Sequence, residues 1–469
     1  MAAGAAPSPR FALRRGGSEV VLEVEGVRHP RTSRGRGRAF TRYADLTHVA
    51  ATPRFVWLAS RRGLVVLPRN QFADAAAPDA LVQALLARVA ELPGGAQQLA
   101  RMAEVDRLGR QPARTPATWG LLAACLATWG VQLAIEPKAT LVASFSSRLF
   151  LHGDWWRPVT ANFLHGFPLH LVFNLVGVYV LGRLVERAFG TARTVCLMML
   201  AAIGAMVPTA WLEQANVVGV SGVVLGLAGA VVWLELRWRA RLPAWWRFPS
   251  ALRWIVIAAL AADLVSGFFL PFIAGSAHLG GFAMGLLAAA AISREGPGAP
   301  APLGGRIAAG ALAAGVVLAF AAAGVELVRH DDYVAHHAAR LGTLPGIPAE
   351  ELNNVAWFIA LDEDATSAQL DAALELARQA VSETHGRETT MLDTLAEVQF
   401  RLGRSEEAVF TIDRAIAGET DACHLRYYLE QRRRFTGERE ADDRPEDPVF
   451  CRPDLEGPEL PPDEAGLRV

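Results

Sequence analysis

The chain has 469 residues, a formal net charge of −1 and 52% hydrophobic residues. That length allows two or three domains, and that hydrophobic content is high for a soluble protein, so we expect a membrane protein. The near-zero net charge excludes a single-sign field over the whole chain and identifies no partner. No nucleic-acid partner is expected. The four cysteines have no metal-type pair spacing. We expect an all-α polytopic core with a small α+β domain before it and an α-helical repeat domain after it.

The first 115 residues have the polar composition of a soluble domain. Short runs with alternating apolar residues, at residues 20–24, 55–59 and 64–67, precede a helical pattern over residues 80–92. This order predicts a small β-rich domain closed by one helix. Residues 43–72 resemble bacterial pleckstrin-homology-like domains.

Seven apolar segments follow, each near the 20 or so residues that a helix needs to cross the hydrocarbon. They are residues 116–135, 158–184, 194–212, 217–236, 252–272, 276–292 and 307–328. We expect residues 116–295 to form a membrane core and residues 296–330 to form a linker and a seventh helix.

Arginine content predicts how these segments are oriented, because loops that remain in the cytoplasm carry the excess of Lys and Arg. Residues 101–114, 183–193 and 237–253 are arginine-rich, whereas the links at 213–216 and 273–275 have no Lys or Arg. Residues 1–17 contain arginines but no apolar core of signal-peptide length. We therefore expect an uncleaved, multi-pass protein of the cell (inner) membrane, with a cytoplasmic N-terminus and, if all seven helices insert, an extracytoplasmic C-terminus.

The tail after residue 328 is polar and helical. Small residues of the segment from Asn354 to Val381 recur in the segment from Thr394 to Ile416, which suggests tetratricopeptide-like helix pairs over residues 331–436 and a protein ligand for them. Residues 437–469 are acidic and rich in proline, so we expect disorder. Cys423 and Cys451 could form a disulfide outside the cell.

One serine and one histidine lie at matching depth in two apolar segments. Ser221 belongs to Gly219-Val220-Ser221-Gly222, in a run without charged residues from 217 to 234, and His278 lies near the start of the sixth segment. Both segments run from outside to inside in the predicted topology. A strongly polar residue inside a span is costly unless it is paired or wetted, so this pair is a candidate functional site.

The second segment runs the same way and adds further polar groups near its outer boundary. These are Trp156-Arg157, His165, His170 and Asn174. Asn174 lies one helical turn after His170 on the same face. We therefore expect polar groups from the second, fourth and sixth segments to converge near the outer face.

In this order the motifs resemble those of the rhomboid family of intramembrane serine proteases. The matching elements, over roughly residues 116–295, are Trp156-Arg157, His170-x-x-x-Asn174 with Glu186 after it, Gly219-x-Ser221-Gly222, and His278-x-x-Gly281-x-x-x-Gly285. The seventh helix resembles the family's six-plus-one layout.

The resemblance implies a Ser-His dyad that cleaves transmembrane protein substrates in the lipid bilayer through an acyl-enzyme. His278 would take the proton from Ser221, and the backbone N–H of Ser221 with His170 and Asn174 would hold the oxyanion. Arg157 and Glu186 would anchor loops, and His165 would hydrogen-bond in the outer pocket. No cofactor or metal is implied, and no His-Glu-x-x-His zinc motif is present.

Other interpretations remain open. The glycines around Ser221, with Gly281 and Gly285, could serve helix packing alone. Both Ser221 and His278 are present, which favours the enzyme over a non-catalytic, client-binding rhomboid-like protein. Leu225 stands where the family usually has an aromatic residue against the catalytic imidazole, which keeps that alternative function open. Asp263, in the middle of the fifth segment, is not expected to be a third catalytic residue, and a transporter is poorly supported because no broken-helix pair stands out.

Overall fold

The structure is a computed structural model that describes residues 8–14, 18–30, 38–61, 63–112, 114–212, 217–247 and 275–445, with the isolated residues 258, 261, 262 and 265. The chain forms two compact units. The first contains Met1–Cys125, Phe167–Pro208 and Val220–Ala314, and the second contains Leu126–Gly166, Thr209–Gly219 and Gly315–Val469. Asp263 and most of the fifth predicted span lie outside the described residues.

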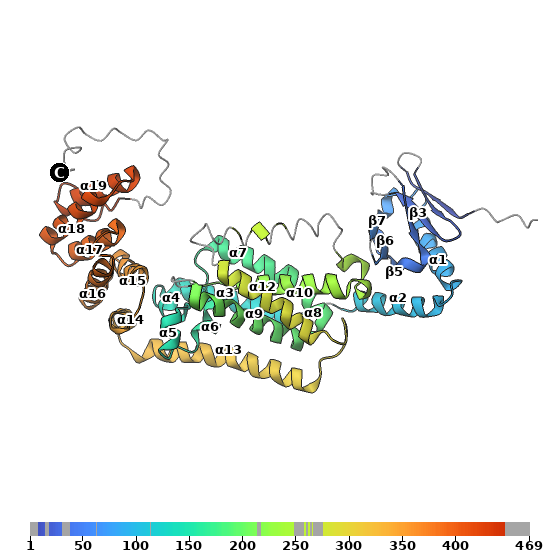
Figure 1. The fold of residues 1–469 in the computed structure, drawn as a ribbon, viewed down its shortest axis with the longest axis horizontal. Coiled ribbons are helices and arrows are strands. Elements are labelled where there is room, and N and C mark those ends of the chain that lie inside the picture. Colours follow the sequence, from blue (N-terminus) through green and yellow to red (C-terminus); the bar gives the residue numbers. More distant parts are fainter. Residues whose placement is uncertain are drawn as a thin grey trace, which may run out of the picture. The chain divides into compact units, whose positions relative to one another are not determined.

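The N-terminal part of the first unit is a small sheet domain (Figure 1). Its first antiparallel sheet has the order β1-β2-β3-β4, with β1 at Arg10–Ala12, β2 at Glu19–Leu22, β3 at Gly26–Pro30 and β4 at Arg38–Arg42. The second sheet consists of β5 (Leu46–Ala51), β6 (Phe55–Ser60) and β7 (Leu64–Pro68). Helices α1 (Ala77–Ala90) and α2 (Gly95–Arg110) follow, and α1 closes the apolar core with Leu81 and Leu85.

Buried polar side chains join this domain to the link after helix α10 (Ser221–Arg237) within the same unit. Arg247 donates to Thr47 Oγ1 at 2.7 Å and to the carbonyls of Ser60 and Leu242. His48 Nδ1 accepts a hydrogen bond from the Ala244 N–H at 2.9 Å. Arg247 and His48 are buried, so these hydrogen bonds replace contacts with water and make the contact between domain and link specific.

Among the described residues, five helices are long and apolar enough to cross a membrane: Pro116–Ile135, Pro168–Phe189, Thr191–Ala210, Gly275–Ile292 and Leu303–Arg329. They correspond to α3 (Pro116–Ile135), the run α7 (Pro168–Gly177), η4 (Val178–Gly182, a π-helical turn) and α8 (Arg183–Phe189), then α9 (Thr191–Leu212), α12 (Gly275–Ile292) and α13 (Leu303–Arg329). The chain is mostly helical, with several such helices and a small N-terminal sheet domain. This is the architecture of an integral membrane protein.

Two predicted boundaries need correction. The second span begins at Pro168 rather than at residue 158, because α6 (Arg157–Thr160) and the 3₁₀ turn η3 (Ala161–Phe163) form a separate element before it. The fourth begins at Ser221 rather than at residue 217, because Gly219 has a φ of 119°, outside the helical region. The resulting helix α10 (Ser221–Arg237) has 17 residues and falls just below the length of the five helices above.

The second unit contains short helices after α3 and a set of helices after α13. These are α4 (Lys138–Ala143), α5 (Ser147–Leu151), α14 (Tyr333–Thr343), α15 (Ala349–Leu361), α16 (Ser367–Glu383), α17 (Thr389–Arg401), α18 (Ser405–Gly418) and α19 (Ala422–Phe435). Neighbouring helices contact each other in the pairs α15 with α16 and α17 with α18. Cys423 in α19 is disulfide-bonded, and Cys451 lies outside the described residues.

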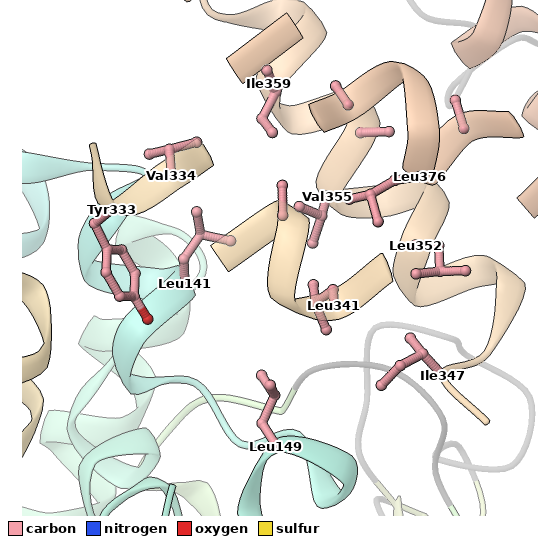
Figure 2. Close-up of a cluster of buried hydrophobic side chains, with 14 of the residues drawn as sticks. Leu141, Leu149, Tyr333, Val334, Leu341, Ile347, Leu352, Val355, Ile359 and Leu376 are labelled. Atoms are coloured by element: carbon pink, nitrogen blue, oxygen red, sulfur yellow. The ribbon is translucent and has the colours of Figure 1, made fainter. Parts of the chain in front are cut away.

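One apolar cluster joins the two parts of this unit. Figure 2 shows Leu141 and Leu149, from the segment after α3, in the same cluster as Tyr333, Leu341 and Leu352 of the C-terminal helices. Tyr333 is 2% exposed, and its burial raises the pKa of its hydroxyl to about 12. The C-terminal helices therefore share a core with the segment after α3 instead of hanging free at the end of α13.

Candidate active site

Ser221 and His278 face each other across the contact between α10 and α12. Ser221 is the first residue of α10 and is partly exposed, whereas His278 is the fourth residue of α12 and is buried. The Ser221 Oγ lies 2.9 Å from the His278 Nε2. With the hydroxyl as donor, the imidazole is placed to accept the proton that a serine must lose on attacking a carbonyl carbon.

Glycines let the two helices approach until their backbones touch. A Cβ added at Gly281 would lie 2.1 Å from the Gly222 carbonyl oxygen, and one added at Gly285 would lie 2.0 Å from that of Gly226. The two glycine pairs advance by four residues on both helices, so the helices run parallel in a fixed register. This register places the first residue of α10 beside His278.

Two further polar side chains come from α7. Asn174 is 6% exposed, and among the described residues its Nδ2 has no hydrogen-bond partner. His170, one turn earlier, packs against Phe167, with ring centroids 5.5 Å apart. A buried amide donor left without a partner is costly, and such groups in a folded protein are usually kept for a ligand or a bound water.

The Trp156-Arg157 motif lies in the second unit, and both side chains are buried and hydrogen-bonded. Arg157 is fully buried and donates to Asp154 Oδ2 at 2.7 Å and to the carbonyls of Ser144 and Leu141 at 2.8 and 2.9 Å. Trp156 Nε1 donates to another carbonyl of α4, that of Val142. These side chains hold the C-terminal end of α4, where carbonyls lack helical partners.

Glu186 and His165 each hold a helix or a turn in place. Glu186 in α8 accepts hydrogen bonds from the backbone N–H groups of Ala117 and Thr118 and from the Thr118 hydroxyl, so it caps the start of α3. The backbone of His165 exchanges hydrogen bonds with the Gln132 amide at 3.0 and 3.2 Å.

Sequence reasoning missed Asp154, Thr118 and Gln132, the partners of Arg157, Glu186 and His165. Asp154 carried a signal, because it precedes Arg157 by three residues, within reach in a turn or short helix. Thr118 and Gln132 carried none, since they are 68 and 33 residues from their partners.

Comparison with known proteins gives a family for this region. Residues 152–295 match the Rhomboid domain. The chain is 26% identical over 293 residues to rhomboid protease GluP of Bacillus subtilis (strain 168), covering 62% of this chain and 51% of that protein. It is 32% identical over 180 residues to rhomboid protease GlpG of Yersinia pestis (strain Pestoides F), covering 37% of this chain and 62% of that protein.

RHOMBOID-like protein 4 of Arabidopsis thaliana is 32% identical over 136 residues, 29% of this chain and 33% of that protein. The chain thus spans between one third and somewhat under two thirds of the length of these relatives. Together, the domain match and the relatives named as rhomboid proteases support a rhomboid-family core within this membrane protein.

Proposed function

We propose that the protein is a serine-type endopeptidase that cleaves transmembrane segments of membrane proteins within the bilayer. The observation that carries this proposal is the 2.9 Å separation of the Ser221 Oγ and the His278 Nε2 at the start of α10. The relatives named as proteases support the same class of activity.

Each step of the reaction can be assigned to a side chain. As the Ser221 Oγ bonds to the substrate carbonyl carbon, its proton passes to the His278 Nε2. The tetrahedral intermediate collapses by breaking the C–N bond, and His278 returns that proton to the leaving amine. Water then gives a proton to His278 and attacks the acyl carbon, and the Ser221 Oγ leaves with the proton restored. This sequence of steps needs neither a metal nor a carboxylate as a third catalytic residue.

The negative oxygen of the tetrahedral intermediate needs hydrogen-bond donors. We assign this role to the unpartnered Nδ2 of Asn174, with His170 and the backbone N–H of Ser221, which lies at the N-terminus of α10. A donor that is already in place and shielded from water costs no reorganisation when charge develops.

The surrounding parts have proposed roles as well. We infer that the N-terminus and the sheet domain are cytoplasmic and that the C-terminal helices are extracytoplasmic, as the arginine distribution predicts. The disulfide at Cys423 supports an oxidising location for α19. We also infer that α15–α18 form tetratricopeptide-like pairs that bind a protein ligand, supported by fully buried alanines such as Ala373 and Ala408 where these helices pack.

One observation favours a second candidate, a non-catalytic rhomboid-like protein that binds membrane clients. Leu225, buried one turn after Ser221, has no ring to stack on His278. Introducing Phe at this position tests how much the missing ring matters.

Cleavage of a single-span model substrate in proteoliposomes tests the proposal. Wild-type protein should produce two fragments, and Ser221→Ala and His278→Ala should produce none, while Ser382→Ala, which changes an exposed serine of α16, should cleave like wild type. A wild-type protein that binds the substrate but never cleaves it, with Leu225→Phe equally inactive, would favour the client-binding alternative.

A further inference from the structure

Three potential metal ligands meet at the junction between α13 and α14. Glu326 lies in the last turn of α13, His330 follows that helix directly, and His336 lies in the first turns of α14. One ligand atom from each side chain lies within 4.8 Å of the others. All three belong to the second unit and none takes part in the proposed proteolysis.

We propose that Glu326, His330 and His336 bind a divalent transition-metal ion of the zinc class. Imidazole nitrogens and a carboxylate oxygen are ordinary zinc ligands, and three protein ligands with water in the fourth position complete a tetrahedral site. Glu326 and His330 have the four-residue spacing that places two ligands on the same face of a helix.

The spacing between the atoms fits an ion better than it fits hydrogen bonds. The Glu326 Oε1 lies 3.7 Å from the His330 Nε2 and 4.0 Å from the His336 Nε2, both beyond hydrogen-bonding distance. Ligands about 2.0–2.2 Å from a tetrahedral zinc ion are about 3.3–3.5 Å from each other. A contraction of about 0.2–0.5 Å would therefore bring the carboxylate oxygen to ligand distance from both imidazole nitrogens, and the two nitrogens, which lie within 4.8 Å of each other, have to converge as well.

The two imidazoles are already gathered at one place. Their rings are stacked, with centroids 3.5 Å apart and an interplanar angle of 9°. Coordination requires the rings to tilt so that their nitrogens converge, and the side chains have room to do so because they are 28% and 35% exposed. The same exposure gives a hydrated ion access from solvent.

The nearby charged side chains do not compete with the two histidines for the Glu326 Oε1. Arg329 lies near the other carboxylate oxygen, 3.8 Å from Oε2. Arg340, the other nearby cation, pairs with Asp154 at 2.9 Å. Asp332 caps α14 and accepts hydrogen bonds from Ala335, Thr366 and Gln369, so its carboxylate is engaged elsewhere.

A metal at this position would tie the end of the seventh helix to the first helix of the C-terminal region. The sequence has no His-Glu-x-x-His motif, which would place zinc ligands one turn apart on one helix, and so no metal was predicted from it. Here the third ligand comes from the next helix, after a bend in the chain, and its approach is a property of the folded junction.

Zinc binding by the full-length protein in detergent tests the proposal. We expect one zinc ion per chain after desalting, measured by elemental analysis, with affinity measured by competition against a chromophoric chelator. Removing a side chain that only hydrogen-bonds to a metal ligand typically weakens metal binding by about 10–100-fold. Removing a ligand itself should cost no less, so we expect Glu326→Gln, His330→Ala and His336→Ala each to weaken zinc binding at least tenfold. His424→Ala, which changes a histidine of α19, should bind like wild type.

Equal zinc binding by wild type and by the His330→Ala/His336→Ala double variant, or no binding by wild type, would overturn the proposal. Histidine modification by diethylpyrocarbonate, read by mass spectrometry on wild-type protein, gives an answer that does not depend on the folding of a variant. Zinc should protect His330 and His336 but leave His424 reactive. Unchanged modification of the first two would also refute the site.

Discussion

The α10–α12 contact and the segment around Arg157 are held in place by opposite kinds of interaction. At the α10–α12 contact, glycines have no side chains to separate the two helix backbones, so Gly281 lies against Gly222 and Gly285 lies against Gly226. In the segment around Arg157, a fully buried guanidinium fills the space and uses its donors on Asp154 and on two carbonyls. Close packing thus fixes the candidate catalytic pair, while charge and hydrogen bonding fix the loop.

The difference predicts different responses to mutation. A backbone contact tolerates no added atom, because neither helix can yield locally without shifting its register. A buried ion pair tolerates no missing partner, because the remaining charge is left without compensation.

The largest effect is expected for Gly281→Ala. The new Cβ would lie 2.1 Å from the Gly222 oxygen, so α12 must move away from α10 and His278 must move away from Ser221. A misplacement of about 1 Å costs about 100-fold in rate, so we expect proteolysis to fall at least that far, with lower thermal stability. Gly120→Ala in α3 is the matched control, since nothing lies within 4 Å of its added Cβ. Full activity of Gly281→Ala would contradict the packing account.

Arg157→Met should destabilise the protein by about 3–5 kcal/mol, because it removes one of the two cations paired with the buried Asp154 and leaves the Ser144 and Leu141 carbonyls without their donor. Thermal unfolding in detergent measures the effect. Arg378→Met removes a mostly solvent-exposed pair with Glu375 and should change stability by less than about 0.5 kcal/mol. Similar losses of stability in both variants would show that burial of the Arg157 ion pair does not increase its contribution to stability.

Asn174→Ala separates chemistry from stability. Removal of one oxyanion donor typically lowers the rate by about 10²–10³-fold, equivalent to about 2.7–4 kcal/mol. Because the Nδ2 has no partner among the described residues, its loss should barely change the melting temperature. Equal loss of activity and stability would instead identify Asn174 as a structural residue.

The smallest effect concerns pH and the contact between the sheet domain and the link after α10. Burial lowers the pKa of His48 from 6.5 to about 4. Between these pH values His48 therefore stays unprotonated in the folded protein, whereas it takes up a proton in the unfolded chain. Stability should therefore fall as the pH drops from 6.5 towards 4, by about 2 kcal/mol between pH 7 and pH 5.

Hydrogen exchange of the amides in β5 and β6 measures this change. In His48→Gln, which cannot titrate, the contribution of this group to the pH dependence should disappear. A pH dependence identical to that of wild type would assign it to other groups.

The sequence predicted most of the described membrane helices because apolar length is a local property. It also predicted that a serine and a histidine at matching depth would lie near each other. It could not place the start of α7, since the apolar composition continues through α6 and the turn before Pro168. Nor could it predict the backbone acceptors of Arg157 and Arg247, because backbone carbonyls carry no sequence signal and become available only where the fold leaves them without a partner.

Labelling with a serine-directed fluorophosphonate tests the central claim most directly, because it reports nucleophilicity at Ser221 without requiring the natural substrate. The account predicts covalent labelling of wild-type protein at Ser221, located by peptide mass spectrometry. Labelling should be lost in Ser221→Ala, strongly reduced in His278→Ala and unchanged in Ser382→Ala. Labelling that persists in Ser221→Ala, or that is absent from folded wild-type protein, would contradict it.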